Sequence, residues 1–277
     1  MIFNLEGETV MSDYLSTEEI HEGLLDLLKF FDQFCQNHGL TYFLAGGTLL
    51  GAIRHEGFIP WDDDADIIMP RKDYQKLLKL GNELPAHFEL KSLENDPNWE
   101  YAFAKVNDTR TYIDDDYRIA QHGLFLDIFP IDYIPDEQMK QKILVTKMKA
   151  LDVLRGAESK KKFKPNEKYI FVKKLLSSFA KKKGANYFAK KMHQLANDTN
   201  IKNRNSKTNG VCVATIYGVR EFLPLAVFEE SIYVRFEDTH LSVPKEYQTY
   251  LESLYGDYMV LPPVEKQKGD HYKIKKY

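Results

Sequence analysis

Four aspartates within five positions run directly into an apolar segment, in the order Asp62-Asp63-Asp64-Ala65-Asp66-Ile67-Ile68-Met69. We predict a strand from Asp62 to Met69, in which alternate side chains share a face, so that Asp62, Asp64 and Asp66 point together. Carboxylates this close repel one another unless a cation neutralises them. Their hard oxygen atoms favour Mg²⁺ or Mn²⁺, held by carboxylates, water and substrate phosphate.

A glycine pair, Gly46-Gly47, precedes the acidic run and separates a predicted strand (residues 40–45) from a predicted helix (residues 48–54). Glycines let the backbone approach a phosphate, and the free N–H groups of a helix start bind anions. A lone acidic loop can be a surface turn or a calcium site, but this one lacks the glycine and glutamate of an EF-hand. Together, the glycine pair and the acidic run predict a site for a metal and a phosphate-bearing substrate.

A further acid, Asp127, lies inside the apolar run Leu124-Phe125-Leu126-Asp127-Ile128-Phe129, which we predict to be a neighbouring strand. A buried acid without a partner is costly, so Asp127 is either part of the metal site or a hydrogen-bonded core acid. Asp132 follows Pro130 and is predicted to cap a helix or a turn.

The pattern of the remaining chain predicts an α+β fold with a mixed sheet flanked by helices. Ser16 and Glu19 have the spacing of a capping box for a helix that ends at Gly39. Further helices are predicted over residues 73–80 and before Tyr255-Gly256, and further strands over residues 100–106, 211–217 and 231–236. We divide the chain into a catalytic core (1–135), a lysine-rich helical subdomain (136–200) and a C-terminal α/β part (201–277) that packs on the core.

Composition limits the class of protein. The hydrophobic content of 43% is ordinary for a globular chain, and no apolar run has the length of a membrane span or the features of a signal peptide. Cys35 and Cys212 lack metal-ligand spacing and are predicted to be buried thiols. We therefore expect a cytoplasmic protein that is neither secreted nor membrane-spanning.

Charge is segregated along the chain. Residues 155–191 contain thirteen Lys and Arg against two acids, a balance of +11, while the rest of the chain sums to −14. This region is predicted to be helical, with an apolar stripe formed by Tyr169, Val172, Leu176 and Phe179. Two interpretations stay open: the lysines solvate the outer face of a packed helix, or they meet an anionic partner, including the inner face of a membrane.

Residues 44–66, from Leu44-Ala45-Gly46-Gly47 to Asp64-Ala65-Asp66, strongly resemble the LicD family of phosphocholine transferases. The resemblance continues through Arg71, Asp73 and Tyr74, and it resumes at residues 105–111, 126–132, 255–259 and 261–263. The lysine-rich middle of the chain is less characteristic.

The resemblance implies a nucleotidyltransferase-type fold and a transfer of phosphocholine, or a related phospho-alcohol, from a CDP-linked donor such as CDP-choline, with release of CMP. The implied acceptor is a sugar hydroxyl of a cell-surface glycan, such as teichoic acid or lipopolysaccharide, in free or lipid-linked form. It also implies that Asp64 and Asp66 are catalytic metal ligands, that Asp62 is an adjacent ligand, and that Asp127 is the third acid. No nucleic-acid partner is expected.

The expected substrate contacts are Gly46, Gly47, Thr48, Arg54, Trp61, Lys105, Arg110 and Lys266. For Arg54, Lys105 and Arg110, a surface ion pair is the alternative. Lys266 is followed by Gln267-Lys268, where the family more often has an arginine, and the nearby His271 is either a substrate contact or incidental. A choline group calls for aromatic rings, for which the candidates are Trp61, Tyr101, Tyr112 and Tyr117, with core packing as the alternative.

Two other functions compete with this interpretation. A nucleotidyltransferase that moves a nucleoside monophosphate from a triphosphate to a small molecule, protein or RNA would use the same metal site. A non-catalytic carbohydrate- or nucleotide-binding relative is the second rival, which the complete set of acids disfavours.

Overall fold

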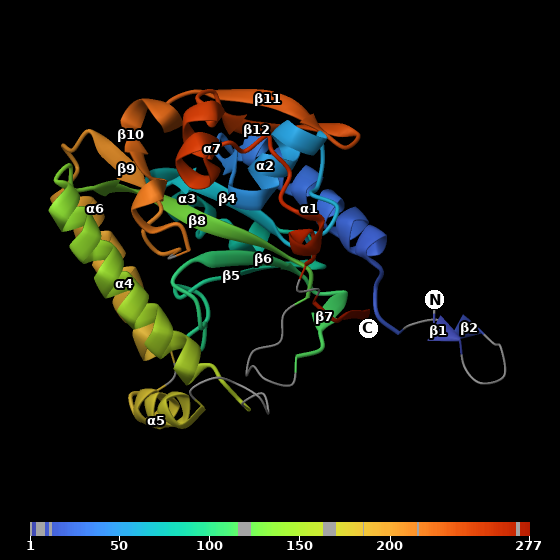
Figure 1. Cartoon of the computed structure of the whole chain (residues 1–277), viewed down its shortest axis with the longest axis horizontal. Helices are drawn as coiled ribbons and strands as arrows, with labels where there is room; N and C mark the ends of the chain where they lie inside the picture. Colours follow the sequence, from blue (N-terminus) through green and yellow to red (C-terminus); the bar gives the residue numbers. More distant parts are fainter. Residues whose placement is uncertain are drawn as a thin grey trace.

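A mixed β-sheet with helices around it forms the centre of the molecule (Figure 1). The computed structural model describes residues 2–3, 9–10, 13–115, 123–162, 170–184, 186–214, 216–269 and 272–277. Two short strands, β1 (Ile2–Phe3) and β2 (Thr9–Val10), pair with each other near the N-terminus. The predicted α+β class is confirmed.

Strand β8 organises the sheet. The sheet strands are β3 (Phe43–Leu44), β4 (Ala65–Pro70), β5 (Phe88–Lys91), β6 (Ala104–Asp108), β8 (Phe125–Ile134), β9 (Thr208–Gly210) and β10 (Phe222–Pro224). β8 runs parallel to β4 and antiparallel to β6 and β9, which pair with successive parts of it. β3 pairs with β4, β5 with β6 and β10 with β9. The same sheet therefore contains strands from residues 43–134 and from residues 208–224.

Helices pack on this sheet and supply much of the core. The described helices are α1 (Thr17–His38), α2 (Gly46–His55), α3 (Arg71–Leu77), α4 (Gln138–Glu158), α5 (Ile170–Lys181), α6 (Tyr187–Lys202) and α7 (Tyr247–Tyr255). Helices α1, α3 and α6 contact β8, and α2 contacts β4. The predicted capping box of α1 is confirmed: Ser16 and Glu19 bond reciprocally, and Gly39 ends the helix at φ 59°.

Two further antiparallel pairs complete the fold. Strands β11 (Ser231–Phe236) and β12 (Thr239–Pro244) form a hairpin whose second strand packs beside β3. The C-terminal strand β13 (Ile274–Lys276) pairs with β7 (Thr111–Ile113). The C-terminal segment therefore returns to the edge of the fold near residues 111–113, as Figure 1 shows.

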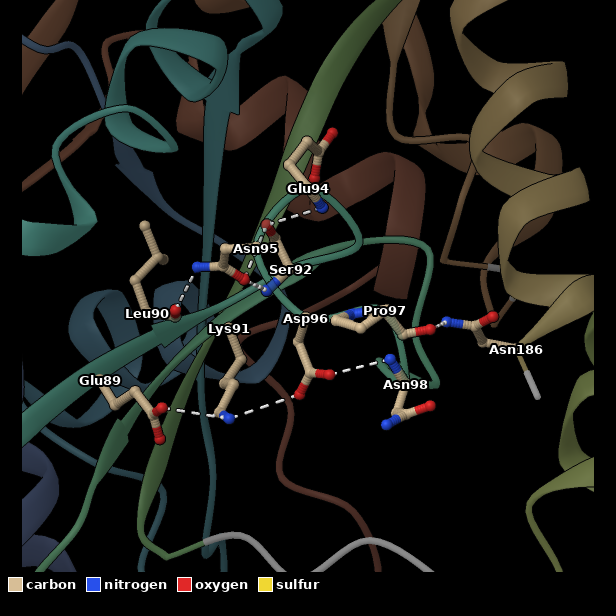
Figure 2. Close-up of polar contacts among 10 residues, drawn as sticks. All are labelled: Glu89, Leu90, Lys91, Ser92, Glu94, Asn95, Asp96, Pro97, Asn98 and Asn186. Atoms are coloured by element: carbon tan, nitrogen blue, oxygen red, sulfur yellow. Dashed lines mark hydrogen bonds and ion pairs between the residues drawn. The ribbon is translucent and has the colours of Figure 1, made fainter.

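The loop after β5 connects the sheet to the residue that precedes helix α6 (Figure 2). Lys91 Nζ lies 3.1 Å from Glu89 Oε1 and 3.3 Å from Asp96 Oδ2. The amide of Asn95 donates to the carbonyl oxygen of Leu90 at 2.6 Å, which closes the loop. From the other side, the side-chain amide of Asn186, the residue before α6, donates to the carbonyl oxygen of Pro97 (Figure 2). These bonds fix the start of α6 against the core.

Several predicted boundaries were wrong. The acidic run is not strand from Asp62, because β4 begins at Ala65 and the backbone N–H of Asp62 instead closes a turn onto the carbonyl oxygen of Ile59 at 2.9 Å. The predicted strand 211–217 is not a strand in the described residues; Val211, Cys212 and Val213 are apolar because they are buried in the core. Both cysteines are buried free thiols, as predicted.

Asp132 is not a cap, contrary to the prediction. It lies within β8, fully buried, and accepts two hydrogen bonds from Arg71, at 2.7 Å from Nε and 2.6 Å from Nη2. Burial raises the pKa of Asp132, and the Arg71 guanidinium opposes that rise. Pro130 does not end the strand. It stays in register with Met69 of β4, and it lies between the part of β8 that pairs with β6, as far as Ile128, and the part that pairs with β9, from Asp132 on, so its missing N–H leaves no gap in these two antiparallel ladders.

Candidate functional site

The glycine pair and the acidic strand meet at the start of α2. The backbone N–H of Asp66 donates to Thr48 Oγ1 at 2.8 Å, and the N–H of Ala45 donates to the carbonyl oxygen of Asp66 at 3.0 Å. Gly46 has φ 51°, a conformation that glycine adopts without strain. These bonds hold the first turn of helix α2 against Asp66, at the start of strand β4.

The two glycines make room for two of the carboxylates. A Cβ atom on Gly46 would lie 3.1 Å from Asp66 Oδ2, and one on Gly47 would lie 2.6 Å from Asp62 Oδ2. A side chain at either position would therefore crowd a carboxylate. The glycines allow two acidic side chains to sit directly beside the N–H groups at the helix start, where negative charge is favoured.

Asp127 joins these acids from the adjacent strand. Asp66 and Asp127 are register partners in the parallel pair β4 and β8. Burial, together with the charges of Asp62 and Asp127, raises the pKa of Asp64 to about 7. Burial and the nearby carboxylates of Asp64 and Asp127 also hold the pKa of Asp66 well above its usual range. The structure thus brings Asp62, Asp64, Asp66 and Asp127 within electrostatic reach of one another.

The chemistry of this donor set fits a hard divalent cation. Desolvated carboxylates that repel one another gain most from a positive ion, and the absence of a side chain at Gly46 and Gly47 leaves space beside Asp66 Oδ2 and Asp62 Oδ2. Within the described ranges, no three His, Cys, Asp or Glu side chains already have the arrangement of a metal-ion site. Carboxylate oxygens are the ligand type that Mg²⁺ and Mn²⁺ prefer in proteins.

Lys105 supplies a positive charge within the acid cluster. Its Nζ lies 2.7 Å from Asp127 Oδ1, and the two residues are register partners in β6 and β8. Lys105 is buried, with Nζ 3.4 Å from the centre of the Phe125 ring and 4.6 Å from that of Tyr101. Predicted as a phosphate contact, Lys105 serves in this structure as the partner of an acid.

The other predicted cations lie in different surroundings. Arg54, at the end of α2, donates from Nη1 to the carbonyl oxygen of Tyr258 at 3.0 Å, and burial lowers its pKa. Arg110 forms an ion pair with Asp108 at 2.6 Å, which corresponds to the alternative interpretation of this residue. Lys266 is exposed in the short 3-10 turn Val264–Lys266.

The predicted aromatic residues are dispersed. Trp61 is half-buried and meets the ring of His55 edge-on at 6.2 Å. Tyr101 packs against Trp99 and Phe103, whereas the ring of Tyr112 lies 4.9 Å from that of Tyr277. Tyr117 and His271 lie outside the described residues. Tyr112 thus packs against another aromatic ring, whereas Tyr101 contacts two aromatic rings and also the cationic groups of Lys105 and Arg155.

Three tyrosines that the sequence did not single out as site residues border the acids. The hydroxyl of Tyr250 accepts a hydrogen bond from the backbone N–H of Gly46 at 3.3 Å. The hydroxyls of Tyr217 and Tyr255 lie 2.6 Å apart. Burial raises the pKa of Tyr217 to about 12, and the negative charge of Asp66 adds to that rise. The negative charge of Asp66 also contributes to the raised pKa values of Tyr250 and Tyr255, so all three hydroxyls lie within electrostatic range of the acid cluster.

Two distant segments hold the acidic loop in place. The backbone N–H of Tyr272 donates to Asp63 Oδ2 at 2.6 Å, and Asp63 is buried. His21 Nε2 lies 2.7 Å from the carbonyl oxygen of Asp62, with its ring stacked on Phe58 at 4.5 Å. The side chain of Asp63 thus anchors the loop to the C-terminal segment, while its neighbours contribute to the acid cluster.

Comparison with known proteins supports the motif-based resemblance. The family model described as "LicD/FKTN/FKRP, nucleotidyltransferase domain" matches residues 39–178. The lipopolysaccharide cholinephosphotransferase LicD of Haemophilus influenzae is 32% identical over 252 residues, which cover 89% of this chain and 92% of that protein. An uncharacterized protein of Rickettsia typhi is 37% identical over 74 residues, covering 26% of this chain and 24% of its own length. The chain therefore belongs to the LicD family.

Proposed function

We propose that this protein is a metal-dependent transferase that moves phosphocholine, or a related phospho-alcohol, from a CDP-linked donor to a sugar hydroxyl of a cell-surface glycan and releases CMP. The similarity to the Haemophilus influenzae cholinephosphotransferase over nearly the whole chain supports this class of reaction. The description of the matching family model supports a nucleotidyltransferase-type core. The acceptor is of the lipopolysaccharide or teichoic acid type, and the reaction is cytoplasmic.

The observation that carries the proposal is the convergence of Asp62, Asp64, Asp66 and Asp127 beside the glycine start of α2. These four carboxylates are the residues that would hold Mg²⁺ or Mn²⁺. A divalent cation at this position would neutralise the charge that develops on the donor diphosphate during transfer. Without a positive partner, an anionic diphosphate would be repelled by the same four acids.

The chain's own groups position the substrates in this proposal. The N–H groups of Gly47 and Thr48, at the start of α2, bind a phosphate oxygen of the donor, because a helix N-terminus favours negative charge. Gly46 directs its N–H to Tyr250 instead, which fixes the turn. Trp61, next to the acidic loop, and Arg54 remain proposed contacts of the donor.

Asp127 is the proposed acceptor of the proton from the sugar hydroxyl. It is the acid contributed by the neighbouring strand, and its Oδ1 is held at 2.7 Å by Lys105. A positioned general base of this kind typically contributes about 10²–10⁴-fold in rate. Loss of that proton makes the hydroxyl oxygen a stronger nucleophile toward the phosphorus that carries choline. Arg110 and Lys266 remain predicted phosphate contacts that depend on how the donor extends from the site.

A donor panel tests the proposal. The protein is incubated with Mg²⁺, a lipopolysaccharide or teichoic acid acceptor, and in turn CDP-choline, CDP-ethanolamine, a CDP-polyol or a nucleoside triphosphate. Release of CMP with phosphocholine on the acceptor supports the proposal, and Asp64→Asn serves as the inactive control. Release of pyrophosphate from a triphosphate would instead show nucleotidyl transfer. Binding of donor without turnover of any donor would indicate a non-catalytic relative.

A further inference from the structure

Helix α5 turns its apolar side chains away from the rest of the protein. Phe171, Val172, Leu175 and Phe179 are exposed by 78%, 52%, 64% and 50% of their surface, and we call these four residues the exposed stripe. The predicted stripe differs: Leu176 is half-buried, and Tyr169 lies outside the described residues. The buried side chains of α5 are small ones, Ser177 and Ala180.

The two faces of α5 are reversed relative to an ordinary surface helix. At about 100° per residue, the exposed stripe occupies an arc of about 100°, and Ser177 and Ala180 fall on the opposite side of the helix. Ser177 and Ala180 are the buried side chains of α5, and α5 packs on α4, near one end of which it lies (Figure 1). Helices of globular proteins normally bury the apolar arc and expose the polar one. An apolar arc of two phenylalanines, a leucine and a valine therefore has no partner within the described part of this chain.

Positive charge surrounds the exposed stripe. Lys174, Lys181, Lys182 and Lys183 are exposed, and the sequence has no acid between residues 170 and 184. Lys183 Nζ lies 5.7 Å from the centre of the Phe179 ring, so a cation and an apolar ring share one surface. Apolar residues flanked by lysines are the composition of a helix that lies in the interface of an anionic bilayer.

Helix α4, on which α5 packs, ends close to the candidate site. Arg155, in the last turn of α4, lies over the ring of Tyr101, with its Cζ 5.0 Å from the ring centre. The same ring lies 4.6 Å from Nζ of Lys105, which pairs with Asp127. A short series of contacts therefore links the acid cluster to the end of the helix on which α5 packs.

We propose that α5 docks the protein on a membrane surface that contains anionic lipid, with the exposed stripe inserted between headgroups and the lysines in contact with lipid phosphate. The twelve residues of α5 are too few to cross a bilayer, and no helix in the described ranges has the length and hydrophobicity of a membrane span. Charge complementarity favours this occupant over a second copy, because two copies facing through α5 would bring lysines against lysines.

Vesicle sedimentation of the full chain tests the proposal. Vesicles made half of phosphatidylglycerol and half of phosphatidylcholine should bind the protein at low salt, more weakly at high salt, and pure phosphatidylcholine should bind it poorly. The variant Phe171→Ser/Phe179→Ser should lower the partition coefficient more than about tenfold. Lys181→Gln/Lys182→Gln/Lys183→Gln should lower it by about fivefold per lysine.

Matched control variants separate docking from general surface effects. Ile201→Ser and Val264→Ser remove apolar side chains that are also exposed, by 68% and 78%, but lie outside α5, and they should bind vesicles like the wild type. Equal binding by the wild type and Phe171→Ser/Phe179→Ser, or no binding at low salt, overturns the proposal. If the same variant turns a dimer into a monomer in light scattering while vesicles bind neither protein, the exposed stripe is an interface between copies.

Docking through α5 does not depend on the proposed transferase reaction. Vesicle binding needs neither donor nor acceptor, so it is measured independently of catalysis. Binding to vesicles without any transfer activity would support the docking surface and contradict the proposed function. Transfer of phosphocholine without binding to anionic vesicles would support the proposed function and contradict the docking surface.

Discussion

Lys105 Nζ lies 2.7 Å from Oδ1 of Asp127, and the two residues face each other across the antiparallel strands β6 and β8. Lys105 is buried, and it is a positive group whose charge opposes the raised pKa values of both Asp64 and Asp66. The strand pairing that builds the sheet therefore also places a cation among the acids.

We predict that Lys105→Met destabilises the protein by about 3 kcal/mol, because it leaves the carboxylate of Asp127 without its positive partner beside other acids. The double variant Lys105→Met/Asp127→Asn should recover most of that loss, since the uncompensated charge is then gone. Urea unfolding of the four proteins in this cycle measures the coupling. Additive effects of the two substitutions would show that the pair contributes no specific stabilisation.

We predict that Asp64→Asn and Asp66→Asn each reduce turnover below about a tenth of the wild-type rate, because each removes negative charge where a cation stabilises the reaction. Both variants should stay folded, and in the absence of divalent metal each should melt at a higher temperature than the wild type, since the repulsion among the acids is relieved. Addition of Mg²⁺ or Mn²⁺ should stabilise the wild type more than the variants. Calorimetry with and without metal, alongside a turnover assay, checks both parts.

Asp63 provides the matched control for these substitutions. Its Oδ2 accepts the backbone N–H of Tyr272 at 2.6 Å, so Asp63→Asn keeps an acceptor oxygen and should be much milder than Asp64→Asn. Asp63→Ala removes the acceptor and should cost about 1–3 kcal/mol in the free energy of unfolding. Equal loss of turnover in Asp63→Asn and Asp64→Asn would contradict the separate roles that the structure gives these neighbours.

The site could be predicted where its residues are close in sequence, and not where they are distant. Gly46, Gly47 and the acidic run lie within one strand-turn-helix-strand segment, so spacing alone brings them together. Tyr272 and Tyr250, by contrast, lie 209 and 204 positions from the groups they bond, Asp63 and Gly46. No periodicity in the sequence reports such pairs.

Prediction of the fold from the sequence was also limited to what local signals determine. The class and most elements follow from capping, glycine stops and apolar periodicity, which are local signals. The apolar run 211–213 was wrongly assigned to a strand, because burial and strand pairing both select apolar residues. Whether the apolar arc of α5 faces the body or the outside was likewise open, because the helical period is the same in both cases.

We predict that Gly47→Ala lowers turnover with little loss of stability. Gly47 is the second residue of α2, where alanine is a better helix former, but the added Cβ would lie 2.6 Å from Asp62 Oδ2. The carboxylate of Asp62 must therefore move away from the glycine turn. Gly51→Ala is a contrasting variant, because its Cβ would lie 2.4 Å from the backbone carbonyl oxygen of Gly57 and should destabilise the fold itself. A turnover assay and urea unfolding distinguish the two effects; full activity in Gly47→Ala would contradict the proposed position of Asp62.

The last prediction concerns Glu221, a buried acid whose charge acts on Tyr217 and Tyr250, two of the tyrosines that border the site. Its Oε2 atom has no hydrogen-bond partner within the described ranges, and its charge contributes to the raised pKa of Tyr250. Burial holds the pKa of Glu221 well above its usual range, with Arg220 opposing the rise. In the unfolded chain, the same carboxyl loses its proton at an ordinary, lower pH.

The sign of the pH effect follows from these two pKa values. Between them the unfolded chain binds fewer protons than the folded protein at this position, so the free energy of unfolding falls as pH rises. The slope from this one group is about 1.4 kcal/mol per pH unit, and it vanishes above the folded-state pKa. Glu221→Gln keeps the shape and removes the titration, so the stability difference between variant and wild type should shift in favour of the variant as pH rises from about 5 to about 8. Urea unfolding at several pH values measures this difference. A pH-independent difference would mean that Glu221 ionises as readily in the folded protein as in the unfolded chain.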